Sequence, residues 1–535
     1  MTPTFNLLDE PWIRVSRLDG SSDEVSLLAL FRQAQDIGGI HGEIASQDVA
    51  ILRLLLAICH RTMGGPPDLA TWRRYWDDPD LLAEHATVYL ERYRDRFDLR
   101  DPQRPFFQVA GLHSASRKAD IYDIGEIIAD LPKPGRRLFT QRTSSESTTL
   151  PWPETARWLI HLHAYDGPGT HSLADGDTNP NSRYASKGYL GQIGVVYIEG
   201  DTLRHTLILN TVPVDLATKN HGPTIINDTP PWERDPDDAR GKIEKPLRGP
   251  ASCYTWQSRR AIVEGTETGS NRFFFSNGDE VGLTNGFSFE FMTSWKLPSK
   301  KRVFLPQIPS IEEAAWRRLP SVLPQLDHTT RFRPPEVVNF YSRLIQRRLA
   351  PRTPLMKIHT TAVVYQNDHI KELIDDEIDI PQRLLDKTSL RMMTVVRDAM
   401  KQTKDVADAL QELAANLDHA RGKISNTSSG ARNRASETFY HVIDEEFPRW
   451  LASLDGADPD TARDQWRSLL RSTAEQQQDT LVSTMPPTAF AGRGEGKGRM
   501  DVSRALYFFR SALDRALPRP TSTTPRDKDE ERTPS

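Results

Sequence analysis

The last part of the chain carries an apolar pattern that constrains its fold more than any other feature. Beyond residue 380, apolar side chains recur at steps of three, four and seven residues, the spacing that places them on one face of a helix. Four such stripes follow one another, at residues 385–417, 439–454, 466–481 and 502–517, with Gly, Ser, Asn and Asp between them. Consecutive amphipathic helices bury their apolar faces against each other. We therefore predict a four-helix bundle over residues 379–517.

The preceding residues, 1–378, mix helical and strand patterns with long stretches of turn residues. Helices are predicted at 48–63, 80–95 and 153–163. β-rich runs at 192–199 and 203–212 predict a hairpin that turns at 199–201, and further strands are predicted at 253–263, 271–275 and 287–293. The predicted class is α+β: a large mixed α/β N-terminal domain with long loops, followed by the bundle. Residues 518–535 are rich in Thr, Pro and charge and are predicted to be a disordered tail.

Composition excludes several classes of protein. The 69 Lys and Arg residues against 73 Asp and Glu residues leave a net charge of −4, which excludes a chain that grips nucleic acid through its overall field. Cys59 and Cys253 are the two cysteines, and neither lies in a Cys-x-x-Cys pair, so they predict neither a disulfide framework nor a zinc site. With no signal-peptide pattern and no apolar run approaching ~20 residues, we predict a cytoplasmic protein that does not contact membranes.

Two acidic runs are the strongest hint of catalysis in this sequence. Residues 375–377 (DDE) and 444–446 (DEE) could supply the carboxylates of a two-metal nuclease. Neither run has a further carboxylate or His at a recognisable spacing, so solvated acidic faces are the favoured interpretation. We predict a binding subunit that is not an enzyme and carries no metal or cofactor. A metal-dependent nuclease and a protein-only helical scaffold remain as alternatives.

Several short runs resemble one known family. Residues 5–15, FNLLDEPWIRV, resemble the opening of the CasA family, the large subunit of the type I-E CRISPR surveillance complex, Cascade. Similar runs follow in the same order: PFFQ at 105–108, HTLILN at 205–210, PPW at 230–232, GPASCYTWQSRR at 249–260 and, more loosely, residues 435–450. Each run alone is weakly specific, but together they cover residues 5 to about 517 in order.

The resemblance implies a function in RNA-guided antiviral defence. Members of this family hold the 5′ handle of the guide RNA and read the protospacer-adjacent motif (PAM) in double-stranded DNA, largely from the minor groove. They help open the duplex for R-loop formation and then dock a helicase–nuclease. In such complexes the protein reads shape and the short motif, while base pairing reads the sequence. The implied partners therefore include guide RNA, target DNA, the small-subunit dimer, the backbone subunits and the helicase–nuclease.

The resemblance also implies a contact with the guide-RNA handle. The family places a loop aromatic there, and Phe139 matches it, with Arg137 and Arg142 close by in the sequence. An aromatic ring stacks on a base while Arg side chains meet phosphates. The alternative is that Phe139 anchors a small local core.

For PAM recognition the resemblance implies two loops and a set of lysines. The family's glycine loop matches Gly167, Pro168 and Gly169, where a bare backbone can approach the minor groove because no Cβ holds it away. The family's wedge, inserted beneath the motif to part the strands, falls within residues 365–369, tipped by His369 or Gln366. The wedge candidates are Gln366, Asn367, Asp368 and His369. The family's lysine finger has no match, since Gly286 stands at that position; Lys296, Lys300 or Lys301 could replace it. Ordinary turns remain the alternative for each segment.

Overall fold

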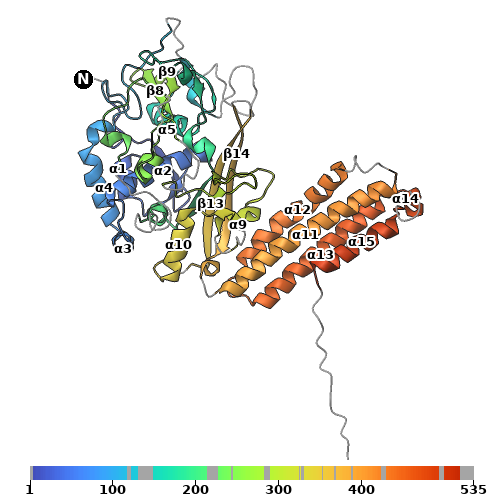
Figure 1. The fold of residues 1–535 in the computed structure, drawn as a ribbon. Coiled ribbons are helices and arrows are strands. Elements are labelled where there is room, and N and C mark those ends of the chain that lie inside the picture. Colours follow the sequence, from blue (N-terminus) through green and yellow to red (C-terminus); the bar gives the residue numbers. More distant parts are fainter. Residues whose placement is uncertain are drawn as a thin grey trace, which may run out of the picture. The chain divides into compact units, whose positions relative to one another are not determined.

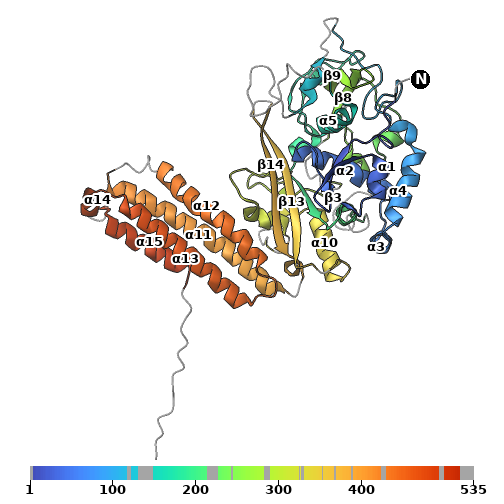
Figure 2. The same ribbon diagram turned by 180° about the vertical axis from the view of Figure 1, so that it is seen from behind.

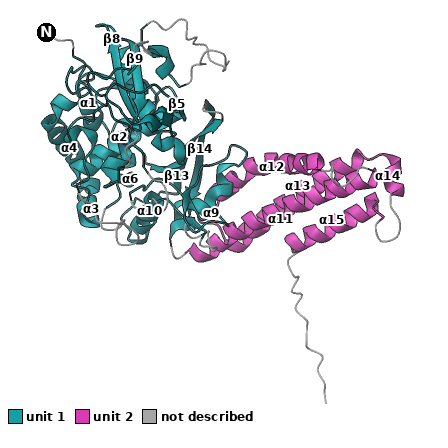
Figure 3. Ribbon diagram, turned by 45° about the horizontal axis from the view of Figure 1, so that its top comes forward, with its two compact units in different colours: residues 1–387 teal, residues 388–535 magenta. Residues whose placement is uncertain are grey.

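The chain divides into two compact units, residues 1–387 and 388–535 (Figure 3). The computed structural model describes residues 4–116, 122–129, 149–213, 227–241, 245–281, 289–323, 326, 331–351, 353–366, 369–386, 389–422, 429–492 and 499–518. Helices and short sheets alternate in the first unit and helices alone make up the described part of the second, which confirms the predicted α+β class. The division at 387 falls later than the predicted boundary at 378, because strand β14 (His369–Pro381) runs through that point. Residues 519–535 of the predicted tail at 518–535 lie outside the described residues.

Helix α2 (Ala45–Thr62) is the centre of the first unit (Figure 1). Every side chain from 49 to 60 is buried, because this helix packs against other helices on several sides. A small antiparallel sheet of order β2-β1-β3 lies at the start of the chain. Its strands and the surrounding helices are β1 (Ile13–Arg17), β2 (Ser22–Val25), β3 (Ile37–Ile40), α1 (Leu27–Arg32), α3 (Leu69–Asp77), α4 (Leu81–Arg92), α5 (Trp152–Tyr165), α6 (Leu203–Asn210), α8 (Pro250–Tyr254), α9 (Leu319–Val322) and α10 (Glu336–Gln346). The helices predicted at 48–63, 80–95 and 153–163 are confirmed as α2, α4 and α5.

The most extended element of the first unit is the hairpin of β13 (Leu355–Gln366) and β14, visible as a long two-stranded arm in both views (Figures 1 and 2). Its register runs from Leu355 opposite Pro381 to Gln366 opposite His369. Strand β7 (Val195–Glu199) pairs with β13 on its other side and completes the sheet. The remaining strands are β4 (Tyr122–Asp123), β5 (Gly169–Thr170), β6 (Tyr184–Ala185), β8 (Arg259–Gly265), β9 (Ser270–Asn277), β10 (Trp295–Lys296), β11 (Leu305–Pro306) and β12 (Phe332–Arg333). Short 3-10 helices are η1 (Arg94–Arg96), η2 (Ile124–Ile127), η3 (Pro180–Arg183), η4 (Tyr189–Gln192), η5 (Pro231–Glu233), η6 (Ala315–Arg318) and η7 (Gln382–Leu385).

The predicted hairpin at 192–212 is wrong in its second half, where residues 203–210 form helix α6. Thr202 caps this helix by accepting from the backbone N–H of His205 at 3.2 Å, as N-cap threonines do. Asn210 replaces the missing strand partner: its amide bonds both the N–H and the C=O of Ile198, at 3.0 and 2.7 Å. The strand predicted at 253–263 is also partly wrong, since 250–254 is helix α8 and β8 begins at Arg259. The strand at 271–275 is confirmed within β9, and residues 289–293 form no strand.

The second unit confirms the predicted four long helices, which are α11 (Leu390–Ala420), α12 (Ser429–Ala452), α13 (Pro459–Ser483) and α15 (Val502–Ala516), with the short α14 (Pro487–Ala491) before the last. Helix α11 packs against α12, α13 and α15, and the predicted apolar stripes lie at these contacts. Trp466 stands 5.1 Å from Phe447 and 5.0 Å from Trp450 between ring centroids. Asp458 and Asp501 cap α13 and α15, which explains the Asp residues between the stripes. No described helix of either unit combines the length and apolarity of a membrane span.

Candidate nucleic-acid interface

The predicted glycine loop lies directly after α5 and is held by one buried guanidinium. Arg259, at the start of β8, is 2% exposed and donates from Nε to the Asp166 carboxylate at 2.6 Å. It also donates to the backbone carbonyls of Gly167 at 2.9 Å and Ser186 at 2.8 Å. Charge-assisted hydrogen bonds of this kind are stronger than neutral ones. The loop therefore has a defined path where it leaves the helix.

The structure has room for a side chain at Gly169. It pairs with Ala185 in the small β5–β6 ladder, and a Cβ built on it would meet no atom within 4 Å. Gly188 is the opposite case, because a Cβ there would lie 2.5 Å from the carbonyl oxygen of Ala164. Packing thus requires glycine at 188 but not at 169. The approach of another molecule to the Gly169 backbone stays a prediction, which a larger side chain at 169 can test because the chain leaves room for it.

The predicted wedge is the tip of the long hairpin. Gln366 ends β13 with an exposed side chain, and its backbone pairs with that of His369 at the start of β14. Asn367 and Asp368 lie outside the described residues, as does the side chain of His369. Ladder hydrogen bonds along this two-stranded arm support the tip.

The structure brings these two segments together, although they lie about two hundred residues apart in the sequence. Tyr365, next to the tip, donates its hydroxyl to the backbone carbonyl of Tyr165, the last residue of α5. Burial raises the pKa of Tyr365 well above its ordinary value, so the hydroxyl keeps its proton and remains a donor. Lys187 lies 5.1 Å from the centroid of the Tyr365 ring, and a Cβ on Gly191 would stand 2.6 Å from the hydroxyl oxygen. Glycine at 191 is what lets this ring approach.

We call residues 165–169, 187 and 365–366 the loop–hairpin junction. Sequence reasoning found its two loops, with Tyr365 in the wedge segment, but did not find that Arg259, Tyr365 and Lys187 position them. Arg259 stands in one of the runs that carry the family resemblance, yet nothing local predicts that its guanidinium reaches the 166–167 backbone. Partners separated by 93 and 200 residues leave no periodic signal in the sequence.

The remaining predicted residues lie elsewhere or outside the description. Lys296 is exposed on β10, in a separate three-stranded sheet, with its Nζ 5.8 Å from the centroid of the Phe332 ring. Lys300 is exposed in the turn after this strand. Among the described contacts, none connects either lysine with the loop–hairpin junction. The guide-RNA candidates Phe139, Arg137 and Arg142 lie outside the described residues.

Among the described residues, neither acidic run forms a cluster of carboxylates within its own unit. Asp375, Asp376 and Glu377 alternate across β14, so Asp376 pairs with Arg318 while Glu377 faces Lys357 at 3.5 Å. On α12, residues 445 and 446 both pair with Arg449, at 3.5 and 2.9 Å. Over the parts of the chain that the structure describes, no three His, Cys, Asp or Glu side chains are grouped to hold a metal ion.

These features define a class: a two-unit α+β protein in which a mixed first unit presents a glycine loop beside a hairpin tip and a helical bundle follows. Solved CRISPR-associated proteins have this architecture. The crystal structure of Thermobifida fusca Cse1 is 30% identical, covers 96% of this chain and 98% of its own, and superposes with a TM-score of 0.84. A chain of a solved CRISPR RNA-guided surveillance complex shares the fold, with a TM-score of 0.73 at 16% identity over 96% of this chain and 99% of its own.

Sequence comparison leads to the same family. The family model described as CRISPR-associated protein Cse1 matches residues 6–477. CRISPR-associated protein CasA/Cse1 of Thermus thermophilus is 25% identical over 494 residues, which is 88% of this chain and 91% of that protein. The chain belongs to the Cse1 family, also called CasA, and the resemblance drawn from its sequence is confirmed.

Proposed function

We propose that this protein is the large, non-catalytic subunit of an RNA-guided DNA-surveillance complex, in which it recognises the PAM in duplex DNA from the minor groove. The loop–hairpin junction carries the proposal. The Tyr365 hydroxyl ties the hairpin tip to the end of α5, where the glycine loop begins. One segment can then read the groove while its neighbour parts the strands beside it.

Minor-groove reading suits the chemistry of this junction. A·T and T·A pairs look nearly alike from the minor groove, so groove width and the G·C amino group carry most of the information there. A backbone without a Cβ, as at Gly169, can approach such a groove closely. The exposed Gln366 amide offers both donors and an acceptor to base edges freed beneath the motif.

The net charge of −4 fits a subunit that sorts motifs and leaves general phosphate attraction to its partners. We expect weak DNA binding by the isolated chain and selective binding in the assembly. The proposed partners are the 5′ handle of the guide RNA, the small-subunit dimer, the backbone subunits and, after R-loop formation, a helicase–nuclease. The shared fold with a chain of a CRISPR RNA-guided surveillance complex supports this assignment.

Duplex binding by the reconstituted complex tests the proposal. Complexes with and without this chain are titrated with duplexes that carry the matching target and either a correct or a scrambled motif. We expect tight binding in one of the four cases, with the chain present and the motif correct. Equal affinity in all four cases would refute the proposed role.

A further inference from the structure

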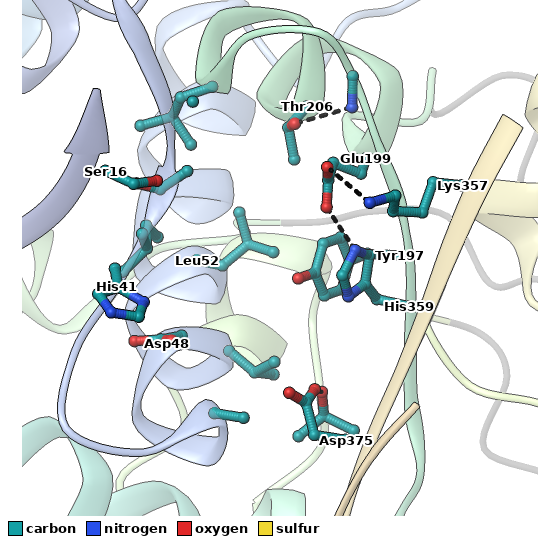
Figure 4. Close-up of a pocket in the computed structure, with 18 of the residues that line it drawn as sticks. Ser16, His41, Asp48, Leu52, Tyr197, Glu199, Thr206, Lys357, His359 and Asp375 are labelled. Atoms are coloured by element: carbon teal, nitrogen blue, oxygen red, sulfur yellow. Dashed lines mark hydrogen bonds and ion pairs between the residues drawn. The ribbon is translucent and has the colours of Figure 1, made fainter. Parts of the chain in front are cut away.

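The first unit contains a cavity that the loop–hairpin junction does not use. It has a volume of about 580 Å³, within the range of small-molecule sites. One wall is the face of the β7–β13–β14 sheet, and the other is formed by β3 and the N-terminal half of α2. Figure 4 shows His41 and Asp48 on one side of this space, facing Tyr197 and His359 on the other.

The strand register arranges the sheet wall in three rows of side chains. Residues at i and i+2 of a strand share a face, so every second residue of each strand points into the same space. In order along the sheet, the rows are Val195, Thr361 and Asp375; then Tyr197, His359 and Glu377; then Glu199, Lys357 and Asp379.

The middle row of this wall carries two aromatic rings. The Tyr197 and His359 rings stack with centroids 4.8 Å apart and planes 8° from parallel. Glu199 pairs with His359 and lies 3.8 Å from Lys357. Burial opposes ionisation of Glu199, but the hydrogen bonds and charges of His359 and Lys357 together outweigh it and lower the pKa of this carboxyl group. The two stacked rings therefore lie between the row of Asp375 and the row of Asp379.

The two ends of the cavity are acidic. Asp375 and Asp48 lie at one end, where Asp375 accepts from Thr361 at 3.2 Å and Asp48 from the Gly42 N–H at 2.6 Å. Asp379 lines the other end, in the row that also holds Glu199 and the one cation of this row, Lys357, and Asp201 lines the cavity as well. None of the carboxylates of Asp48, Asp375 and Asp379 forms an ion pair with a described residue. Asp375 and Asp379 are four residues apart on β14, which at about 3.3 Å per residue separates the two ends by about 13 Å.

We propose that this cavity binds a linear aliphatic polyamine, with an ammonium group at each acidic end and its chain along the Tyr197–His359 stack. A single metal ion fits poorly, because its ligands must converge within about 2–2.6 Å of one point, whereas these carboxylates are spread along the strand. Ammonium groups spaced along a chain match that spread, and the aliphatic segments between them can pack against the two stacked rings. The site is independent of the proposed DNA-binding role.

Calorimetric titration of the intact chain with spermidine tests this proposal, with butylamine and Mg²⁺ as comparison ligands. We expect saturable binding of one spermidine, at least tenfold weaker binding of butylamine, and no displacement by an equal concentration of Mg²⁺. Asp375→Asn and Asp379→Asn should each weaken spermidine binding about fivefold, the scale of one exposed ion pair. Both residues are exposed, so their variants should keep the melting temperature of the parent protein.

Glu10→Gln is the matched control, because it removes one exposed negative charge of the same unit away from the cavity. Its spermidine affinity should equal that of the parent. Absence of saturable binding below millimolar spermidine, or the same loss in Glu10→Gln as in Asp375→Asn, would overturn the proposal. Equal binding of butylamine and spermidine would overturn it as well.

Discussion

Replacing Tyr365 with Phe tests whether the hairpin tip and the glycine loop act as one unit. The hydroxyl of Tyr365 donates to the carbonyl of Tyr165 at the end of α5. Phenylalanine keeps the ring, its packing against Gly191 and the cation–π contact with Lys187. The variant therefore loses one hydrogen bond and leaves the Tyr165 carbonyl without that donor.

The size of the effect follows from what that hydrogen bond contributes. A typical intramolecular hydrogen bond contributes about 0.5–1.5 kcal/mol, and an unsatisfied buried acceptor costs about 1–3 kcal/mol. If the junction must be ordered to bind DNA, most of this cost appears in the binding step. We expect the affinity of the reconstituted complex for a correct-motif duplex to fall by about 1–2 kcal/mol, or roughly 5- to 30-fold.

Fluorescence anisotropy with correct-motif and scrambled-motif duplexes measures this loss. Tyr254→Phe is the matched control, since the Tyr254 hydroxyl is buried and has no hydrogen-bond partner among the described residues. Removing it should leave both affinities unchanged. An unchanged affinity in Tyr365→Phe, or an equal loss on both duplexes, would refute the coupling of hairpin and loop.

Gly169→Leu should leave the melting temperature and assembly on guide RNA unchanged, because the added side chain has room, while weakening correct-motif duplex binding; a loss confined to assembly would contradict the assignment. Phe139→Ala should weaken binding to guide-loaded particles by about 1–3 kcal/mol, the contribution of one base–aromatic stack, and an unchanged affinity would favour a local core role. Burial, reinforced by the charge of Asp375, raises the pKa of Asp48 from 3.8 to about 7. The ionisation of Asp48 therefore lowers the free energy of unfolding as the pH rises from about 4 to about 7. Asp48→Asn, which keeps an acceptor for Gly42, should therefore raise the free energy of unfolding at pH 8 by about 2–4 kcal/mol and hardly change it at pH 4 in urea titrations; the same difference at both pH values would exclude this titration. Arg53→Met should lower the free energy of unfolding by about 3–5 kcal/mol, because it leaves the Glu290 carboxylate buried without its cation, and Arg53→Met/Glu290→Leu should recover part of that loss.

The four long helices of the second unit could be predicted from the sequence because their signal is local. Each apolar stripe repeats within a few helical turns. Such a stripe is buried by packing against a neighbouring helix. Helix α2 was predictable for a related reason, since its apolar run is too long for a typical strand. The family resemblance added the identity of the two loops, again from short contiguous runs.

The strand predicted at 203–212 shows where local patterns fail. The run LRHTLILN suits a strand as well as a helix by its residue types. The competing strand position beside Ile198 is occupied by the Asn210 side chain, and Thr202 caps the helix. Short apolar runs take the conformation that their surroundings allow, and those surroundings come from distant parts of the chain.

Local periodicity was therefore enough to predict the α+β class and the helical unit of this protein, while the two candidate loops came from the family resemblance of short contiguous runs. Three contacts could be seen only in the tertiary structure. The two loops meet through the hydrogen bond between Tyr365 and Tyr165, and Arg53 forms an ion pair with Glu290. Acidic side chains of β14 line a cavity whose other wall includes α2. The physical reason is sequence separation. A side chain bonds to whatever the fold brings within about 3 Å, and partners 200 or 237 residues away leave no pattern in a single sequence.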